Sequence, residues 1–344
     1  MPTAIPRLAR ALALAGLAAA TGALASACSS APAATNTADT SSSVVINLGD
    51  QQQDLQTLLT AAGALKGAPY KVNFLEFDSG PLVDAGFAAH RIDLGFMGDL
   101  PASLAVKSGL PVVTVAVTRS IGASEYLLAR PGITSIAQLR GKPVAYTTGT
   151  AEQAFALRAL KTAGLTQTDV HQVNVSLLQL GTALQSGAAV ASVVSAEQKA
   201  DYQLEHPDSK VLATIRTVSP PSYGYVLATK AALADPGKRN AIGDLTRRLI
   251  QASNWQKSHQ AQWVTDYYVT VEHQTTAVAK LVLAAGGTET YVPITAAVQG
   301  ALQQMVDIMA SSGGLPASFS VAPLYSAAEA ARYDAIVRAV PQHG

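Results

Sequence analysis

The chain has 344 residues, of which 49% are hydrophobic and only 14% are charged, and its 24 basic and 23 acidic residues give a formal net charge of +1. This length and hydrophobic content are sufficient for more than one packed core. Binding to nucleic-acid phosphates needs a basic excess that this chain lacks, and with 6% aromatic residues no stacking platform for bases stands out. Composition therefore argues against a nucleic-acid partner.

Residues 1–27 have the pattern of a secretory signal peptide. Arg7 and Arg10 precede a short run of apolar and small residues, and small residues lead up to Cys28, the single cysteine of the chain. The segment LASAC resembles the bacterial lipoprotein box, which implies a lipid on Cys28 and a location on the outer face of the cell membrane or in the periplasm. A plain signal peptide followed by an incidental cysteine is the alternative, and the apolar run is too short to span a membrane.

The segment after this cysteine is expected to be a flexible linker. Residues 28–43, CSSAPAATNTADTSSS, are rich in Ser, Thr, Ala and Pro and contain few hydrophobic side chains. Because the single cysteine is assigned to lipidation, disulfides and cysteine-based metal sites are not expected in the domain that follows.

From Val44 the sequence alternates between strand and helix patterns. In the first series, strands are predicted over 44–48, 70–77 and 92–98, each followed by a helix, and longer strands over 111–118 and 125–130 flank a turn at Gly122. In the second series, strands are predicted over 143–149, 171–177, 190–195, 210–218 and 223–230, with helices over 150–165, 180–188 and 196–207. The remainder, from Ala231, is predicted to be mainly helical.

This alternation predicts parallel sheets with helices on both faces. The predicted fold class is α/β, with two doubly wound lobes joined by a two-strand hinge. Residues 44–127 and 226–344 are assigned to lobe 1, and residues 128–225 to lobe 2. In open α/β sheets, ligands bind beyond the carboxyl ends of the strands, so the strand-to-helix turns should line a cleft between the lobes.

Four of these turns, at 49–52, 79–80, 98–99 and 147–151, offer glycines, hydroxyls and backbone N–H groups at a helix N-terminus. Free N–H groups and the positive end of the helix dipole favour an oxyanion such as a sulfonate, a sulfate or a nitrate-like group. Ordinary helix capping is the alternative reading of any one turn, whereas convergence of several turns on one cleft favours anion binding.

The sequence predicts no catalytic residues, no cofactor and no metal site. Its six histidines fall on predicted loops or polar helix faces without metal-ligand spacing, and the GxSxG, GxxxxGK[ST] and strand–GxGxxG motifs are absent. Ser195 follows a strand, but it lacks flanking glycines and an assignable base, which is more typical of a helix cap than of a nucleophile.

A family resemblance is carried by the segments FDSG, VDAGFAAHRIDLGFMGDLP, ASEYLLAR, ITSIAQLRGKPVAYTTGTA and LRALKTAGL, in this order. Together they resemble the taurine, aliphatic-sulfonate and nitrate group of periplasmic substrate-binding proteins, over roughly residues 44–230. The resemblance implies a type II, two-lobed receptor that is a monomer without catalysis. Such a receptor closes on a small organic anion and delivers it to an ABC permease and its ATPase.

By position, the resemblance assigns ligand contacts to Gln51, Ser79, Gly80, Gly98, Asp99, Thr148, Gly149 and Thr150. After the strand at 190–195 the family often has a Trp-containing segment, whereas this chain has SAEQ. Glu197 in that segment is a candidate partner for the ammonium of an amino-sulfonate, or else a solvated helix residue. Tyr223 is a candidate replacement for the missing aromatic wall, and Asp99 either caps its helix or selects a ligand with a positive end.

The leading hypothesis is therefore a lipid-anchored receptor for a sulfonate such as taurine or an alkanesulfonate. Two alternatives remain. One is a receptor for a neutral heterocycle such as a thiamine pyrimidine precursor, which would need aromatic walls. The other is an enzyme on the same scaffold, although the related branch that makes this pyrimidine carries a cysteine-rich iron-binding motif and this chain has one cysteine.

Overall fold

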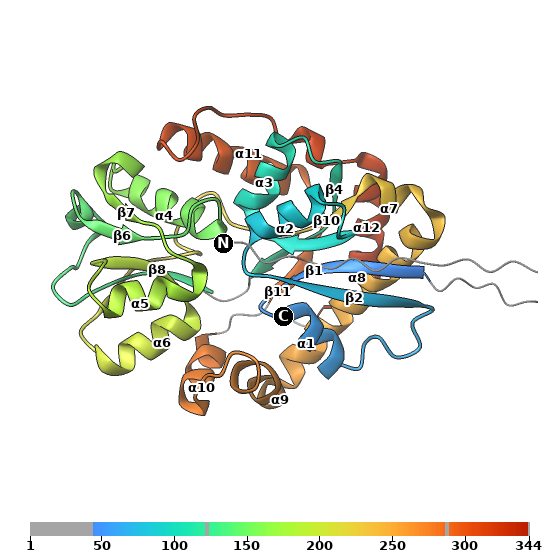
Figure 1. The fold of residues 1–344 in the computed structure, drawn as a ribbon, viewed down its shortest axis with the longest axis horizontal. Coiled ribbons are helices and arrows are strands. Elements are labelled where there is room, and N and C mark those ends of the chain that lie inside the picture. The colour runs from blue at the N-terminus through green and yellow to red at the C-terminus, as the bar shows by residue number, and fades with distance from the viewer. Residues whose placement is uncertain (1–43, 121–123, 286–288, 343–344) are drawn as a thin grey trace, which may run out of the picture. The chain divides into compact units, whose positions relative to one another are not determined.

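The computed structural model describes residues 44–120, 124–285 and 289–342, which are organised around two sheets (Figure 1). The predicted signal peptide, Cys28 and the linker lie outside the described residues, so the lipid anchor stays a prediction. Among the described helices, none has both the length and the apolar character that crossing a membrane requires.

The first sheet has six strands in the order β11–β4–β10–β3–β1–β2. They are β1 (Val44–Gln51), β2 (Tyr70–Phe77), β3 (Leu94–Met97), β4 (Val112–Ser120), β10 (Gly224–Thr229) and β11 (Glu289–Val292). Strand β1 pairs in parallel with β2 and β3, whereas β10 is antiparallel to β3 and β4, and β11 is antiparallel to β4. The predicted parallel pairing holds for β1, β2 and β3, whereas β10 returns from the second sheet and runs antiparallel to its neighbours.

The second sheet has five strands in the order β7–β6–β8–β5–β9. They are β5 (Glu125–Ala129), β6 (Pro143–Ala145), β7 (His171–Val173), β8 (Ala191–Ser195) and β9 (Lys210–Thr214). Strand β6 is parallel to β7 and β8, and β5 is antiparallel to β8 and β9. The chain passes to this sheet from β4 to β5 and returns from β9 to β10, so the predicted pair of crossings is confirmed.

Helices connect the strands of both sheets. They are α1 (Asp54–Ala61), α2 (Gly80–Ala88), α3 (Asp99–Lys107), α4 (Ala151–Thr162), α5 (Leu180–Gln185) and α6 (Ala196–Glu205), together with short 3-10 turns at Ile136–Leu139, Gln167–Asp169 and Leu177–Gln179. Pro81 and Pro101 stand in the first turns of α2 and α3, where no intrahelical N–H partner is lost. The strands supply the core residues between these helices, among them Ile46, Leu48 and Leu127, none of which is exposed.

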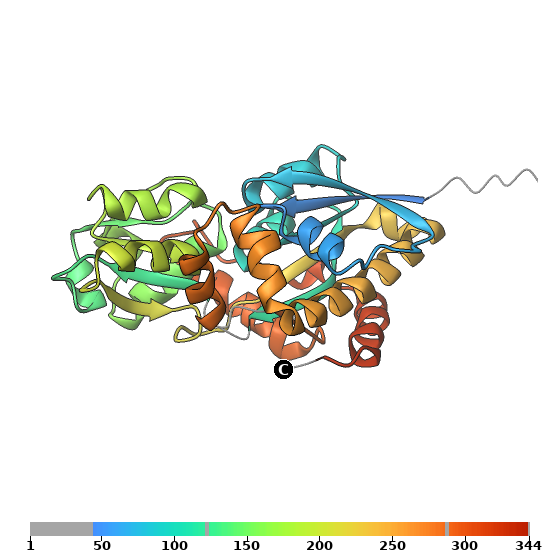
Figure 2. The same cartoon turned by 90° about the horizontal axis from the view of Figure 1, so that it is seen from below.

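The C-terminal part is helical, as predicted, except for β11. It comprises α7 (Lys230–Ala234), α8 (Pro236–Ser258), α9 (Gln260–Trp263), a π-helical segment at Val264–Val269, α10 (Thr276–Ala285), α11 (Ala296–Ser311), a 3-10 turn at Ala322–Leu324 and α12 (Ala327–Ala339). Helices α8 and α12 pack on the first sheet (Figure 1 and Figure 2). Helix α10 packs on α6 and α11 packs on α3 and α4, so the tail contacts helices of both sheets.

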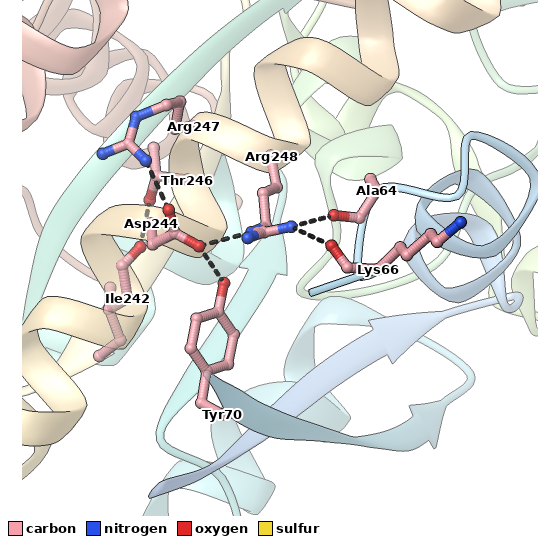
Figure 3. A network of polar contacts seen from close by, with 8 residues as sticks. All are labelled: Ala64, Lys66, Tyr70, Ile242, Asp244, Thr246, Arg247 and Arg248. Carbon is pink, nitrogen blue, oxygen red and sulfur yellow. Dashed lines mark hydrogen bonds and ion pairs between the residues drawn. The ribbon is translucent and has the colours of Figure 1, made fainter. Parts of the chain in front are cut away.

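A polar network holds α8 against the loop between α1 and β2 (Figure 3). The guanidinium of Arg248 donates to the carbonyl oxygens of Ala64 and Lys66 at 2.5 and 3.2 Å and to the carboxylate of Asp244. The same carboxylate accepts the hydroxyl of Tyr70 at 3.0 Å. Burial raises the pKa of Asp244, but the hydrogen bonds from Arg248 and Tyr70 outweigh this effect and bring it below its ordinary value. The network therefore contains a charged carboxylate.

Candidate functional site

A cavity of about 580 Å³ lies where the turns of the two sheets face each other. Its wall includes the turn after β1 and the starts of α2 and α3 from the first sheet. The starts of β5 and α4 contribute from the second sheet, and the segment 215–224 between β9 and β10 completes the wall. Its volume is in the range of small-molecule binding sites.

The N-termini of α2, α3 and α4 meet at this cavity. Gly98, the N-cap of α3, approaches α4 so closely that a Cβ built on it would lie 2.6 Å from the Cβ of Ala151. Gly149, with a φ of 81°, would in the same way meet Pro81 of α2 at 3.3 Å. Because the first N–H groups of a helix lack intrahelical partners, three converging N-termini create a region that favours negative charge.

Five of the ten predicted ligand contacts line the cavity and five do not. Those that line it are Gln51, Gly80, Gly98, Thr150 and Tyr223, and those that do not are Ser79, Asp99, Thr148, Gly149 and Glu197. The fold therefore brings half of the predicted set together at one place, and contact with a ligand stays a prediction for all ten.

Three of the residues outside the cavity wall shape its turns. The carbonyl of Ser79 accepts the N–H of Val83 at 3.1 Å in the first turn of α2. The N–H of Thr148 donates to the side-chain oxygen of Asn174 at 2.9 Å, and the N–H of Gly149 donates to that of Gln153 at 2.8 Å. These bonds fix the backbone that leads into α2 and α4.

Asp99 is buried, and its carboxylate is occupied within the protein. One oxygen accepts the N–H of Leu100 at 2.8 Å, and the other accepts the hydroxyl of Ser222 at 2.7 Å and lies 3.3 Å from the guanidinium of Arg158. Arg158, on α4, also donates to the carbonyl of Pro220 at 2.9 Å. The ion pair therefore joins α3, α4 and the segment before β10.

Aromatic rings line the cavity, and two of the three were not singled out in the sequence. Phe96 of β3 and Tyr267 of the π-helical segment join Tyr223 in its wall. Glu197, at the start of α6, is outside the wall, but its negative charge contributes to the raised pKa values of Tyr267 and Asp54. The cavity is thus bounded by rings as well as by helix termini.

Charged side chains that the sequence did not single out also stand in the wall. Five are carboxylates, Asp50, Asp54, Glu125, Glu152 and Glu289, and two are arginines, Arg119 and Arg216. Asp50 is used structurally, since it accepts the N–H groups of Leu55 at 3.0 Å and of Gln56 at 2.8 Å and so caps α1. The remaining four, Asp54, Glu125, Glu152 and Glu289, contribute carboxyl groups to the wall.

Burial is the main cause of a raised pKa in each of these carboxyl groups. The pKa of Asp54 is raised to about 8, because the negative charges of Asp50 and Glu289 add to burial. Burial and the charge of Glu152 hold the pKa of Glu125 well above its ordinary value. Burial also raises the pKa values of Asp50, Glu152 and Glu289.

These carboxylates do not form a motif in the sequence, because they come from separate segments of the chain. Glu125 begins β5, the first strand of the second sheet along the chain, and Glu289 begins the unpredicted strand β11. Only the position of Glu125 at a predicted crossing could have singled it out. Within the ranges that the structure describes, no three His, Cys, Asp or Glu side chains form a group that could hold a metal ion.

Comparison with known proteins places the chain in a family. The NMT1/THI5 like family matches residues 71–259, which is more than half of the chain. The chain belongs to this family. It is 30% identical over 152 residues to a protein of Escherichia coli (strain K12) named as an aliphatic sulfonates-binding protein. That match covers 43% of this chain and 48% of the relative, so the chain spans about half the length of the curated relative that it matches.

Solved structures show how widely the fold of this NMT1/THI5-like chain is shared. The alkanesulfonate-binding protein SsuA from Xanthomonas axonopodis pv. citri, bound to MOPS, is 21% identical, with a TM-score of 0.72 over 82% of this chain and 98% of that one. The desulfurization enzyme DszB is 12% identical, with a TM-score of 0.58 over 84% of this chain and 98% of that one. The family resemblance and the two-sheet α/β fold drawn from the sequence are confirmed.

Proposed function

We propose that this chain is the solute-binding component of an ABC importer. It binds a small organic solute with an anionic group, a sulfonate such as taurine or an alkanesulfonate, and delivers it to a permease and its ATPase. The observation that carries this proposal is the cavity at which the N-termini of α2, α3 and α4 meet. The names of the Escherichia coli and Xanthomonas relatives, both sulfonate-binding proteins, support it.

In this proposal the anionic group lies against the converging helix termini. Gln51, Gly80, Gly98, Thr150 and Tyr223 contact the solute, because they line the cavity. The predicted residues outside the wall act through the turns that they shape, and Glu197 acts through its negative charge. Lobe 1 (44–127 and 226–344) and lobe 2 (128–225) close on the solute, because only the closed arrangement lets both sets of turns reach it.

The proposed role is binding without turnover. The shared fold with the desulfurization enzyme does not decide this point, because one fold serves both binding and catalysis. The test is to incubate the protein with a bound solute and to search for a product by mass spectrometry. Detection of a product would contradict the proposal.

We further propose that the protein is exported and monomeric, and that a lipid on Cys28 holds it at the outer face of the cell membrane or in the periplasm. The lipoprotein-like segment LASAC and the linker at 28–43 support this location, because together they provide an anchor and a flexible tether.

Titration calorimetry and thermal unfolding with taurine, ethanesulfonate, nitrate and sulfate test the assignment. A solute at a hundredfold excess over its dissociation constant should stabilise the protein by about 2.7 kcal/mol, which is a rise of several degrees in melting temperature. No response to any of the four compounds would refute the sulfonate assignment.

A receptor for a heterocycle is the second candidate function, because Phe96, Tyr223 and Tyr267 line the cavity. Aromatic walls can stack on a planar ring. Tight binding of an aminopyrimidine with no response to taurine or ethanesulfonate would favour this candidate over a sulfonate receptor.

A further inference from the structure

We propose that the solute carries a cationic nitrogen, an ammonium or a protonated ring nitrogen, which is held between the carboxylates of Glu125 and Glu289. The inference rests on the proposed function, since it names the chemical class of solute that the same cavity takes. It identifies two specificity-determining residues on the cavity wall that the sequence did not point to.

The first observation is that both carboxylates have an unsatisfied oxygen. The Oε2 atoms of Glu125 and Glu289 are buried and have no hydrogen-bond partner among residues 44–120, 124–285 and 289–342. Burial raises the pKa of each glutamate, and the charges of Lys257 at Glu289 and of Arg158 at Glu125 oppose this effect, so each group lacks a hydrogen-bond partner for one oxygen and not a counter-charge.

Such an arrangement is costly for the protein alone. Native proteins leave few buried polar atoms without a partner, because such an atom loses its hydrogen bonds to water. A carboxyl group that lines a cavity and has one buried oxygen without a partner is therefore a candidate binding group, whose missing partner arrives with the ligand.

The second observation is the place of the two residues in the fold. Glu125 begins β5 of the second sheet, opposite Ser195 of β8, and Glu289 begins β11 of the first sheet, opposite Ser120 of β4. Both line the same cavity, one from each sheet. A cation between them would contact both sheets at once.

The third observation is the chemistry of the surrounding wall. Phe96, Tyr223 and Tyr267 present aromatic rings to the same cavity, and ring faces attract cations. The carboxyl groups of the wall offer acceptors to a cationic nitrogen, whereas the helix N-termini favour an anionic group. A solute with a negative group at the helix termini and a cationic nitrogen at the two glutamates satisfies both parts of the wall.

The test uses solutes that differ in the nitrogen alone or nearly so. Titration calorimetry on the full chain compares taurine with ethanesulfonate and 3-aminopropanesulfonate with propanesulfonate, and an aminopyrimidine separates a ring nitrogen from an aliphatic ammonium. Ca²⁺ and Zn²⁺ are titrated alone. We expect the compound with the nitrogen to bind at least about tenfold more tightly than its partner, as a charge-assisted hydrogen bond allows.

The variants Glu125→Gln and Glu289→Gln keep the size of the side chain and remove its charge. Each should reduce the preference for the nitrogen-bearing compound by about tenfold. The melting temperature of the free protein should change little, because Gln has the same size as Glu and the Oε2 atom that it replaces makes no hydrogen bond among the described residues. Glu205→Gln is the matched control and should change neither quantity, because Glu205 is an exposed residue of α6 that accepts a hydrogen bond from Gln185 and does not line the cavity.

Three results would overturn the inference and leave the receptor function standing. They are equal binding of the two compounds in each pair, an unchanged preference in both Gln variants, and binding of metal ions or nitrogen-free compounds alone. If no compound of any charge binds, the receptor function fails and the inference fails with it. A preference that both Gln variants abolish supports the inference.

Discussion

Replacing Asp99 by Asn should leave a charged arginine buried without its counter-ion. The side chain of Arg158 is 0% exposed and that of Asp99 is 3% exposed, and the two lie 3.3 Å apart between α3 and α4. Ser222 donates its hydroxyl to the same carboxylate at 2.7 Å. The substitution keeps the size of the side chain, so the loss of charge is the main change.

The magnitude follows from the burial of both partners. Removing one member of a buried ion pair typically costs about 3–5 kcal/mol, because the remaining charge is uncompensated. Arg158 keeps its bonds to the carbonyls of Ala154 and Pro220, and an Asn at position 99 can still accept one hydrogen bond. We therefore expect the lower end, about 3 kcal/mol, which in a chain of this size corresponds to a fall of roughly 6 °C in melting temperature.

Differential scanning calorimetry and urea denaturation measure the change. The double variant Asp99→Asn with Arg158→Met should recover part of the loss, because no buried charge then remains. Arg140→Met, which breaks the ion pair with Asp169 at a side chain that is 61% exposed, is the control and should lower the melting temperature far less than Asp99→Asn, because water screens this pair. A fall of less than about 1 °C for Asp99→Asn would refute the reasoning, since Arg158 would then not depend on this carboxylate.

Three further predictions concern the cavity and the anchor. Gly98→Ala places a Cβ 2.6 Å from that of Ala151, so α3 and α4 must separate, and solute affinity should fall about tenfold, whereas Gly300→Ala, with no atom within 4 Å, should leave it unchanged. Burial raises the pKa of Asp54 from 3.8 to about 8, so its bound proton contributes stability at low pH that is lost as the pH rises through about 8. Asp54→Asn should therefore reduce the fall in melting temperature between about pH 5 and pH 9, and an identical fall in both proteins would contradict this. Cys28→Ser should move the protein from the membrane fraction to the soluble fraction of exporting cells, and retention in the membrane fraction would argue against a lipid anchor.

The order of the elements up to residue 229 could be predicted from the sequence, because hydrophobic runs and capping residues are local signals. The predicted strand 70–77 and the helix that follows Thr150 agree closely with β2 and α4. Boundaries were less accurate, as at 143–149, where β6 ends at Ala145. Strand β11 was missed because four residues between helices carry too little periodicity, and only its pairing with β4 makes it a strand.

The candidate site was predictable only in the parts that depend on backbone. A glycine at a turn before a helix is visible in the sequence, and Gly80 and Gly98 do line the cavity. The sequence did not show which carboxylates are free to contact a solute, because Asp99 and Glu125 both follow or begin a strand-associated turn and differ in no local pattern. Their difference lies in tertiary partners, since Asp99 is paired with Arg158 and Glu125 has a buried oxygen that no described residue satisfies.

This contrast bears on what selects the solute. Helix termini at strand ends are a general property of open α/β sheets, so they provide attraction for an anionic group in any protein with this topology. They cannot by themselves distinguish one small anion from another. Glu125 and Glu289 come from different sheets and face the same cavity, so a solute that satisfies both must bridge the two sheets. Selection of the solute and closure around it would then depend on the same two carboxylates, which couples specificity to the conformation that the permease receives.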